Sequence, residues 1–190
     1  MSYELVIGLE VHVKIKSEKK LFCSCENSQD LTLRPNTHIC PTCSAQPGAL
    51  PVLQESALRQ ALILARTLKC TITNPSTFDR KSYFYPDLPM GYQITQFYEP
   101  YARAGQVTFW DEQYADSHTI CISEAHMETD TAKSIHSDEA VYIDRNRAGT
   151  PLVEIVTAPD FRSADQVTDF LRELQRIVRF NDISDANMEQ

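Results

Sequence analysis

Apolar and polar residues alternate through the first readable segment of the chain, residues 3–16. The apolar positions are Leu9, Val11, Val13 and Ile15, and the polar ones are Glu10, His12, Lys14 and Lys16. A period of two is typical of a β-strand, because successive side chains point to opposite faces. The pattern therefore predicts a strand whose polar face carries Glu10 and His12.

Two later segments have apolar residues at helical spacing. The first follows Pro51, which suits the first turn of a helix, and continues to about Lys69. Its apolar positions are Leu58, Ala61, Leu62, Ala65 and Leu68. The second follows Ser163, which forms a capping-box pattern with Gln166. Its apolar positions are Val167, Phe170, Leu171, Leu174, Ile177 and Val178. Both patterns predict amphipathic helices packed on one face.

The remaining segments predict strands and loops. Residues 23–51 are irregular and rich in proline, which indicates a loop-rich insertion, and the aromatic residues 71–105 indicate ordered loops with short strands. Further strands are expected at residues 106–110, 118–128, 141–144 and 152–156. The predicted fold class is therefore α+β, with a largely antiparallel sheet and a few flanking helices.

Composition and charge narrow the class of protein. The chain has 190 residues, 42% of them hydrophobic, which is ordinary for a globular domain. Its net charge of −8 argues against a domain that binds nucleic acid mainly by neutralising phosphates, so RNA contacts should be local or supplied elsewhere. The N-terminus lacks a secretory signal pattern, and no apolar run has the length of a membrane span. We expect a soluble, cytoplasmic protein without membrane or DNA partners.

Four of the six cysteines lie in the predicted insertion. They form two close pairs, Cys23 with Cys25 and Cys40 with Cys43, separated by fourteen residues. Two such pairs can close a tetrahedral Cys₄ site, which predicts a structural zinc with no open position for substrate. The alternatives are a redox pair at Cys40 and Cys43, or replacement of one cysteine by His38. The remaining cysteines, Cys70 and Cys121, are expected to be small buried hydrophobes.

Carboxylates occupy positions where the predicted strands should be apolar. Glu154 interrupts an aliphatic run, Glu10 lies between two aliphatic residues, and an extended backbone would direct His126, Glu128 and Asp130 to one side. Carboxylate oxygens from three strands could form the site that Mg²⁺ requires together with nucleotide phosphates. His12, two residues after Glu10, would hold a ligating water or indicate that Mn²⁺ is accepted. The alternative is an ordinary solvated polar face.

Cations and aromatic residues lie close together in the middle of the chain. Arg80 and Lys81 could contact phosphates while Tyr83 or Tyr85 stacks on a base, as in proteins that hold single-stranded RNA ends. Lys133 follows the acidic strand and could neutralise a phosphate. The alternatives are core packing for the aromatic residues and simple solvation for the lysine.

Several of these segments resemble the B subunit of the tRNA-dependent amidotransferases, over nearly the whole chain. The motifs, in order, are VIGLEVHV at residues 6–13, PGALPVL at 47–53, FDRKSYFYPD at 78–87, GYQI at 91–94 and GTPLVEIV at 149–156. The resemblance implies a catalytic cradle, distantly similar to glutamine synthetase. Residues 1–190 would be its N-terminal part with a zinc-binding insertion at residues 21–50, and the helical and tail domains that follow in the family would lie outside this chain.

The resemblance also implies an ATP-dependent ligase that works in a heterotrimer with an amidase subunit and a small third subunit. It would phosphorylate the side-chain carboxylate of misacylated Glu-tRNA(Gln) or Asp-tRNA(Asn), and ammonia from glutamine would then displace the phosphate. The family's Mg²⁺ group falls on Glu10, His12, Glu128 and Glu154. Its zinc cysteines, present only in some members, fall on Cys23, Cys25, Cys40 and Cys43.

The chain also departs from the family pattern around the acidic strand. Glu124 stands where arginine is usual, Thr129 replaces a second glutamate, and Thr131 with Ala132 replaces Ala-Gly. Met90 stands where lysine is common. These changes question the phosphate and RNA contacts of that region. A rival interpretation is a zinc-stabilised module that docks proteins or RNA without catalysis, and the choice between glutamyl and aspartyl substrates stays open.

Overall fold

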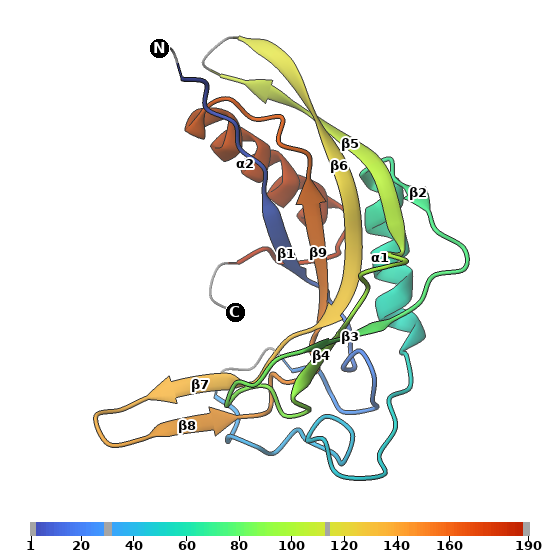
Figure 1. The fold of residues 1–190 in the computed structure, drawn as a ribbon, viewed down its shortest axis with the longest axis vertical. Coiled ribbons are helices and arrows are strands. Elements are labelled where there is room, and N and C mark those ends of the chain that lie inside the picture. Colours follow the sequence, from blue (N-terminus) through green and yellow to red (C-terminus); the bar gives the residue numbers. More distant parts are fainter. Residues whose placement is uncertain (1–2, 29–31, 113–114, 188–190) are drawn as a thin grey trace.

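The structure is a computed structural model that describes residues 3–28, 32–112 and 115–187. Its centre is an antiparallel sheet in the order β1-β9-β6-β5-β2 (Figure 1). These strands are β1 (Glu10–Lys14), β2 (Thr71–Ile72), β5 (Ala102–Asp111), β6 (Asp116–Thr129) and β9 (Pro151–Thr157). Two antiparallel pairs lie outside it, β3 (Asp79–Ser82) with β4 (Tyr92–Thr95), and β7 (Lys133–His136) with β8 (Val141–Asp144). The predicted α+β class with a largely antiparallel sheet is confirmed.

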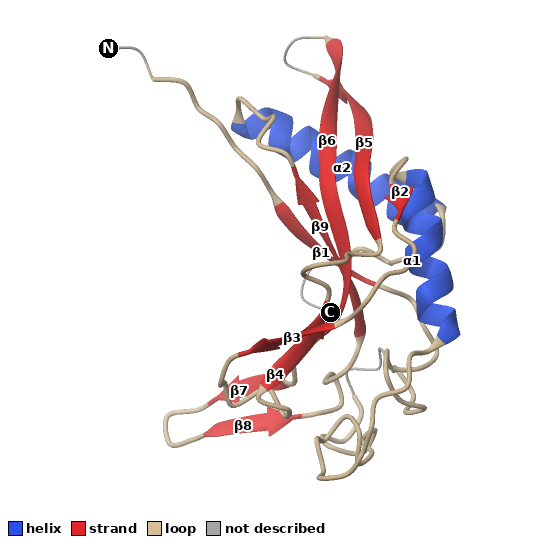
Figure 2. Ribbon diagram, turned by 45° about the vertical axis from the view of Figure 1, so that its right-hand side comes forward, coloured by secondary structure: helices blue, strands red, loops and turns tan. Residues whose placement is uncertain are grey.

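The helices α1 (Glu55–Thr67) and α2 (Ala164–Phe180) supply apolar faces to one core. Helix α2 lies across the sheet (Figure 2), where the ring of Phe170 packs edge-on against Phe109 and Phe161 at centroid distances of 6.0 and 5.1 Å. The predicted cap is present, since the Ser163 hydroxyl accepts a hydrogen bond from the Gln166 amide at 3.2 Å. In the described residues, neither helix has the length and hydropathy needed to cross a bilayer.

Helix α1 begins later than predicted, at Glu55 instead of Pro51. Residues 52–54 are held in an extended path because the amides of Val52 and Gln54 donate to the carbonyls of Phe22 and Leu21, both at 2.9 Å. The amphipathic pattern placed the helix correctly, but a tertiary contact determined its first turn.

An irregularity in β5 and β6 decides which side chains reach the functional face. The β6–β9 register shifts between Ile122 and Glu124, and opposite it in β5 Ala104 has a positive φ of 54°. The extra residue changes the alternation, so that the buried positions of β6 move from Ile120 and Ile122 to Ala125 and Met127. Glu124, and the residues that alternate with it, therefore face away from the core that Ile122 enters.

The described residues of the predicted loop-rich segment, 23–28 and 32–51, contain turns and no helix or strand, and they lie at one end of the sheet near the two outer strand pairs (Figure 1). The Leu21 amide donates to the Gly149 carbonyl at 2.8 Å, just before β9. Asn146 accepts at its side-chain oxygen from the amides of Thr37 and His38, at 2.9 and 2.8 Å. The insertion is therefore tied to the turn that leads into β9.

The strand predictions hold for the long strands and for β8, which has the expected bounds, whereas the first strand is shorter than expected and β7 was missed. The first strand covers only Glu10–Lys14, because the residues before it contact the chain through an isolated bridge between Ile7 and Phe161 and scattered hydrogen bonds, without a continuous ladder. Strand β7 was not predicted, since a two-stranded exposed pair needs no alternating apolar face. Cys121 is exposed on β6, so its predicted burial was wrong, whereas Cys70 is partly buried.

Candidate functional site

Three side chains from three neighbouring strands meet on one face of the sheet. His12 of β1 lies opposite Glu154 of β9, which lies opposite His126 of β6. Directly paired residues in antiparallel strands share a face, and Glu128 shares it too because it is two residues beyond His126. One ligand atom each from His12, Glu128 and Glu154 lies within 4.8 Å of the others. We call these three residues the carboxylate cluster.

The carboxylate cluster is buried at one side and open at the other. Nε2 of His12 lies 2.9 Å from Oε1 of Glu128 and 3.8 Å from Oε2 of Glu154. The side chains are 2% exposed for Glu128, 17% for Glu154 and 51% for His12. A ligand can therefore approach from the His12 side while the carboxylates stay shielded from water.

The electrostatics of the cluster favour a bound cation. The hydrogen bond to Glu128 raises the pKa of His12, with further contributions from nearby carboxylates, although partial burial opposes the rise. Burial raises the pKa of Glu154, and the negative charge of Glu128 raises it further. Neighbouring ligands of octahedral Mg²⁺ at 2.0–2.1 Å are about 3.0 Å apart, close to the His12–Glu128 separation. The donor set thus fits a divalent metal.

Residues of β4 and β6 hold this cluster in place. The Thr95 hydroxyl donates to Oε2 of Glu128 at 3.2 Å. His126 is buried, contacts the Gln96 carbonyl through Nδ1, and places Nε2 3.2 Å from Oε1 of Glu124. Sequence reasoning missed Thr95 and Gln96 because residues 71–105 show no period that could assign their faces.

Glu10 lies on the same face but at the edge of the site. It is exposed and lies outside the three-residue ligand group found among the described residues. Its negative charge nevertheless contributes to the raised pKa of Glu154, which places it nearby. Of the four predicted Mg²⁺ ligands, the structure therefore brings His12, Glu128 and Glu154 to ligand distance, with Glu10 next to them.

A second group of charges adjoins the cluster where β1, β6 and the β8–β9 turn meet. Burial lowers the pKa of Lys14 and raises that of Asp130, and each is opposed by the charge of the other. Nε of Arg147 lies 3.5 Å from Oδ2 of Asp130. Lys14 was not singled out from the sequence, although the alternation through Glu10 and His12 already placed it on their face.

The predicted basic and aromatic residues separate into two sets. Burial raises the pKa of Tyr83, and the charges of Asp87, Glu128 and Asp130 raise it further, so its phenol lies within electrostatic reach of the acidic site. Arg80, Lys81, Tyr85 and Lys133 are exposed. The Arg80 guanidinium lies 5.2 Å from the centre of the Tyr92 ring, and Lys133 begins the projecting β7–β8 pair (Figure 1).

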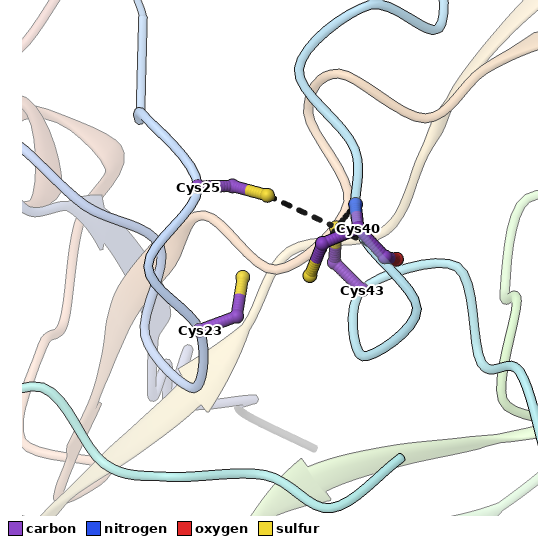
Figure 3. Close-up of side chains that lie close together, drawn as sticks. All are labelled: Cys23, Cys25, Cys40 and Cys43. Carbon is purple, nitrogen blue, oxygen red and sulfur yellow. Dashed lines mark hydrogen bonds between the residues drawn. The ribbon is translucent and has the colours of Figure 1, made fainter. Parts of the chain in front are cut away.

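The four cysteines of the insertion converge as a second cluster, which we call the cysteine cluster. Figure 3 shows the side chains of Cys23, Cys25, Cys40 and Cys43 pointing toward a common centre, and their Sγ atoms all lie within 4.8 Å of one another. Sγ of Cys43 is 3.9 Å from Sγ of Cys25 and 3.9 Å from Sγ of Cys40. Tetrahedral zinc with Zn–S bonds of about 2.3 Å requires S–S separations of about 3.8 Å.

Local geometry favours a metal knuckle over a redox pair. The Cys40 amide donates to the Cys43 thiolate at 3.2 Å, and the Ser44 amide donates to the Cys40 carbonyl at 3.0 Å, which makes a tight turn without a following helix. A hydrogen bond from the Cys23 thiol lowers the pKa of Cys43 to about 4, and burial raises that of Cys25 to about 12. The His38 ring lies 3.7 Å from Glu26, outside the ligand group of four cysteines.

The departures from the family pattern leave the carboxylate cluster intact. Glu124, which stands where arginine is usual in the family, pairs with His126 on the same face of the sheet as the carboxylate cluster. Thr129 follows Glu128 directly on β6, and alternation directs it to the other face. The Thr131 hydroxyl lies 3.4 Å from Oδ2 of Asp87. Met90 lines a small cavity beside the cysteine cluster instead of the carboxylate cluster.

Fold and site together describe an α+β domain with an open carboxylate–histidine site and a closed cysteine site. Residues 5–190 match the family described as the GatB/GatE catalytic domain, and the chain belongs to this family. The family predicted from the motifs is confirmed.

Curated relatives agree over the full extent of the chain. The B subunit of the aspartyl/glutamyl-tRNA(Asn/Gln) amidotransferase of Campylobacter jejuni is 47% identical over 188 residues, covering 99% of this chain and 39% of the relative. The protein of the same name from Oleidesulfovibrio alaskensis is 47% identical over 190 residues, with the same two shares. That of Campylobacter hominis is 45% identical over 188 residues. The chain thus spans 39% of the length of these relatives.

Proposed function

We propose that the chain is the N-terminal catalytic part of the B subunit of a tRNA-dependent amidotransferase, which activates a tRNA-linked carboxylate with ATP. In the proposed reaction, a carboxylate oxygen of misacylated Glu-tRNA(Gln) or Asp-tRNA(Asn) attacks the γ-phosphorus of ATP, and ADP leaves. Ammonia then attacks the acyl carbon and expels phosphate, which leaves the amide. The names of the relatives support this interpretation.

One observation carries the proposal: His12, Glu128 and Glu154 converge from three strands on a face that stays open at His12. Two carboxylates facing one histidine leave a net negative charge that a bound cation would offset. Phosphoryl transfer consists largely of positioning and charge neutralisation, so an open, oxygen-rich cation site is the machinery it needs. When bound there, Mg²⁺ would supply charge neutralisation for the phosphate oxygens.

The chain's own residues would divide the remaining work. Glu128 and Glu154 would hold the metal, His12 would complete the site or hold a ligating water, and Glu10 would bind through the outer coordination sphere. Lys14 lies on the same face of β1 as His12 and could meet a phosphate. Tyr83 is partly buried within electrostatic reach of the acidic site, so it is better placed than the exposed Tyr85 to contact the substrate.

Other residues and subunits would bind the rest of the tRNA. Arg80 and Lys81 are exposed on β3 and could contact its 3′ end, with Lys133 on the projecting pair as a more distant contact. The net charge of −8 indicates that most phosphate neutralisation comes from elsewhere in the complex. We propose an amidase subunit and a small third subunit as partners, a cytoplasmic location, and a structural zinc in the cysteine cluster.

Nucleotide binding by the complete heterotrimer tests the proposal. We expect calorimetry to detect ATP binding that requires Mg²⁺ and that is lost in His12→Ala. His136→Ala, the same substitution at an exposed histidine that ends β7, is the matched control and should bind like the wild type. A docking module without catalysis would give no Mg²⁺-dependent nucleotide binding, and that result would reject the proposal.

A further inference from the structure

Lys20 lies beside the cysteine cluster and is completely buried. Burying an ammonium group is costly unless every donor is satisfied and a negative charge lies nearby. Its Nζ has three hydrogen-bond donors and three acceptors around it: the His38 carbonyl at 2.9 Å, the Arg145 carbonyl at 3.2 Å and the Cys43 sulfur at 3.6 Å. Lys20 therefore lies in a buried pocket that provides an acceptor for each N–H donor of its ammonium group.

The charges identify the partner that this ammonium requires. Both carbonyl acceptors are neutral, so Cys43 supplies the anionic contact. Four thiolates around one Zn²⁺ leave about two net negative charges in a protein interior, which is unfavourable without a neighbouring cation. Lys20 would neutralise one of them through a direct N–H···S contact.

The same three contacts connect separate parts of the chain. His38 lies between the two cysteine pairs, whereas Arg145 lies in the turn between β8 and β9. The Asn36 amide donates to Asp144 at 3.0 Å, so this loop and this turn are also joined beside Lys20. Beyond this turn, β9 begins at Pro151 and carries Glu154 of the carboxylate cluster.

We propose that Lys20 is a positioning residue of the cysteine cluster, which donates to the Cys43 thiolate and locks the metal-bound loop onto the turn before β9. This inference rests on the proposed zinc site. Lys20 should have two effects: it should tighten zinc binding, and it should lower the energy of the sulfur lone pairs of Cys43. Outer partners of metal ligands typically contribute about 10- to 100-fold to metal affinity.

Zinc affinity of the complete protein, measured by competition with a chromogenic chelator, provides the first test. Lys20→Met removes the ammonium and keeps a long side chain, whereas Lys19→Met removes the same charge from the exposed neighbour. We expect Lys20→Met to bind zinc about 10- to 100-fold more weakly and Lys19→Met to match the wild type. Equal affinity in all three would overturn the inference, whereas absence of zinc binding by the wild type would instead reject the site itself.

Cobalt substitution supplies a readout that a merely structural role would not change. Loss of the N–H···S contact should raise the energy of the thiolate electrons, so the sulfur-to-cobalt charge-transfer band of Lys20→Met should shift to lower energy. An unshifted band would contradict the contact.

Should Lys20→Met not fold, reductive methylation of the wild type decides the question. Lys20 should resist modification with zinc bound and become reactive after chelation, while Lys19 reacts in both states. Equal reactivity of Lys20 in both states would overturn the inference.

Discussion

The two clusters of this domain are built in opposite ways. The cysteine cluster gathers ligands from residues 23–43, and irregular loops supply all of them. The carboxylate cluster gathers His12, Glu128 and Glu154 from three adjacent strands that are far apart in sequence. We expect the loop-built cluster to depend on the proposed zinc to fix its backbone, whereas the sheet positions the ligands of the strand-built cluster without a metal.

Openness separates the two clusters further. Four thiolates complete a tetrahedral coordination sphere and leave no position for a substrate. Within the described part of the chain, the carboxylate cluster has three residues at ligand distance, and the outermost, His12, is half exposed. This difference supports the structural role proposed for the cysteine cluster and the catalytic role proposed for the carboxylate cluster.

The largest effect should come from removing metal from the cysteine cluster. Structural zinc sites contribute about 10–16 kcal/mol of apparent binding free energy in small domains, so chelation should disorder the insertion. Elemental analysis should give one zinc per chain, and hydrogen exchange should show faster exchange in residues 21–54 after chelation. The core helix α2 provides the internal control and should keep its protection. Zinc near zero in protein purified without added metal would contradict the assignment.

The next largest effect should come from Glu154→Gln in the complete heterotrimer. The substitution keeps the side-chain volume and removes one ligand charge, so transamidation should fall roughly a hundredfold or more, at about 1.36 kcal/mol per factor of ten. Glutamine hydrolysis on the amidase subunit should largely survive, because only the carboxylate cluster is changed. Both half-reactions should be measured on one preparation, with circular dichroism as the control for folding. Unchanged amidation at limiting Mg²⁺ would make Glu154 a structural carboxylate.

The sequence predicted the cysteine cluster more completely than the carboxylate cluster, for a physical reason. Ligands close together in sequence are constrained by spacing alone, so the pattern of Cys23, Cys25, Cys40 and Cys43 already limited the geometry. Ligands on separate strands depend on strand order and register, which the alternation does not contain. Glu10 and Glu154 were singled out because they interrupt apolar runs, and Glu128 because alternation places it on one side with His126 and Asp130. Their grouping was expected, but the strand order and register that bring Glu128 and Glu154 to His12 came from the structure.

Irregular segments were the hardest to predict. The shift near Ile122 and Glu124 changes which face each later residue of β6 occupies, and a single unpaired residue leaves little trace in the apolar pattern. Thr95 and Lys20 were missed because their roles arise from contacts with residues distant in sequence. The start of α1 was wrong for the same reason.

Acid should weaken metal binding at the carboxylate cluster. Binding requires neutral His12 and ionised Glu154, and the pKa of each is raised above its ordinary value of 6.5 or 4.5. Mn²⁺ affinity should therefore fall as the pH falls through the His12 pKa, by up to about tenfold per pH unit for each proton displaced. The folding stability of the metal-free protein should change in the opposite direction. The His12–Glu128 pair stabilises it fully below the pKa of His12 in the unfolded chain, and this contribution is lost as the pH rises through the raised pKa of His12 in the folded state.

Calorimetric titration with Mn²⁺ at several pH values checks this behaviour. In His12→Gln the imidazole is replaced by an amide that does not take up a proton, so the pH dependence above the Glu154 pKa should flatten. An equally steep dependence in that variant would show that another group controls binding.

The smallest effect should come from Thr95→Val, which tests how far the sheet preorganises the carboxylate cluster. Valine matches threonine in shape but cannot donate to Oε2 of buried Glu128, a contact of 3.2 Å in the wild type. Loss of one hydrogen bond of about 1 kcal/mol should reduce Mn²⁺ affinity about fivefold. Thr108→Val is the matched control, since its hydroxyl bonds only to the exposed Thr119 hydroxyl at 2.8 Å, away from the cluster. Equal Mn²⁺ affinities in the two variants would mean that His12 and the metal alone orient Glu128, and that β4 contributes nothing to the site.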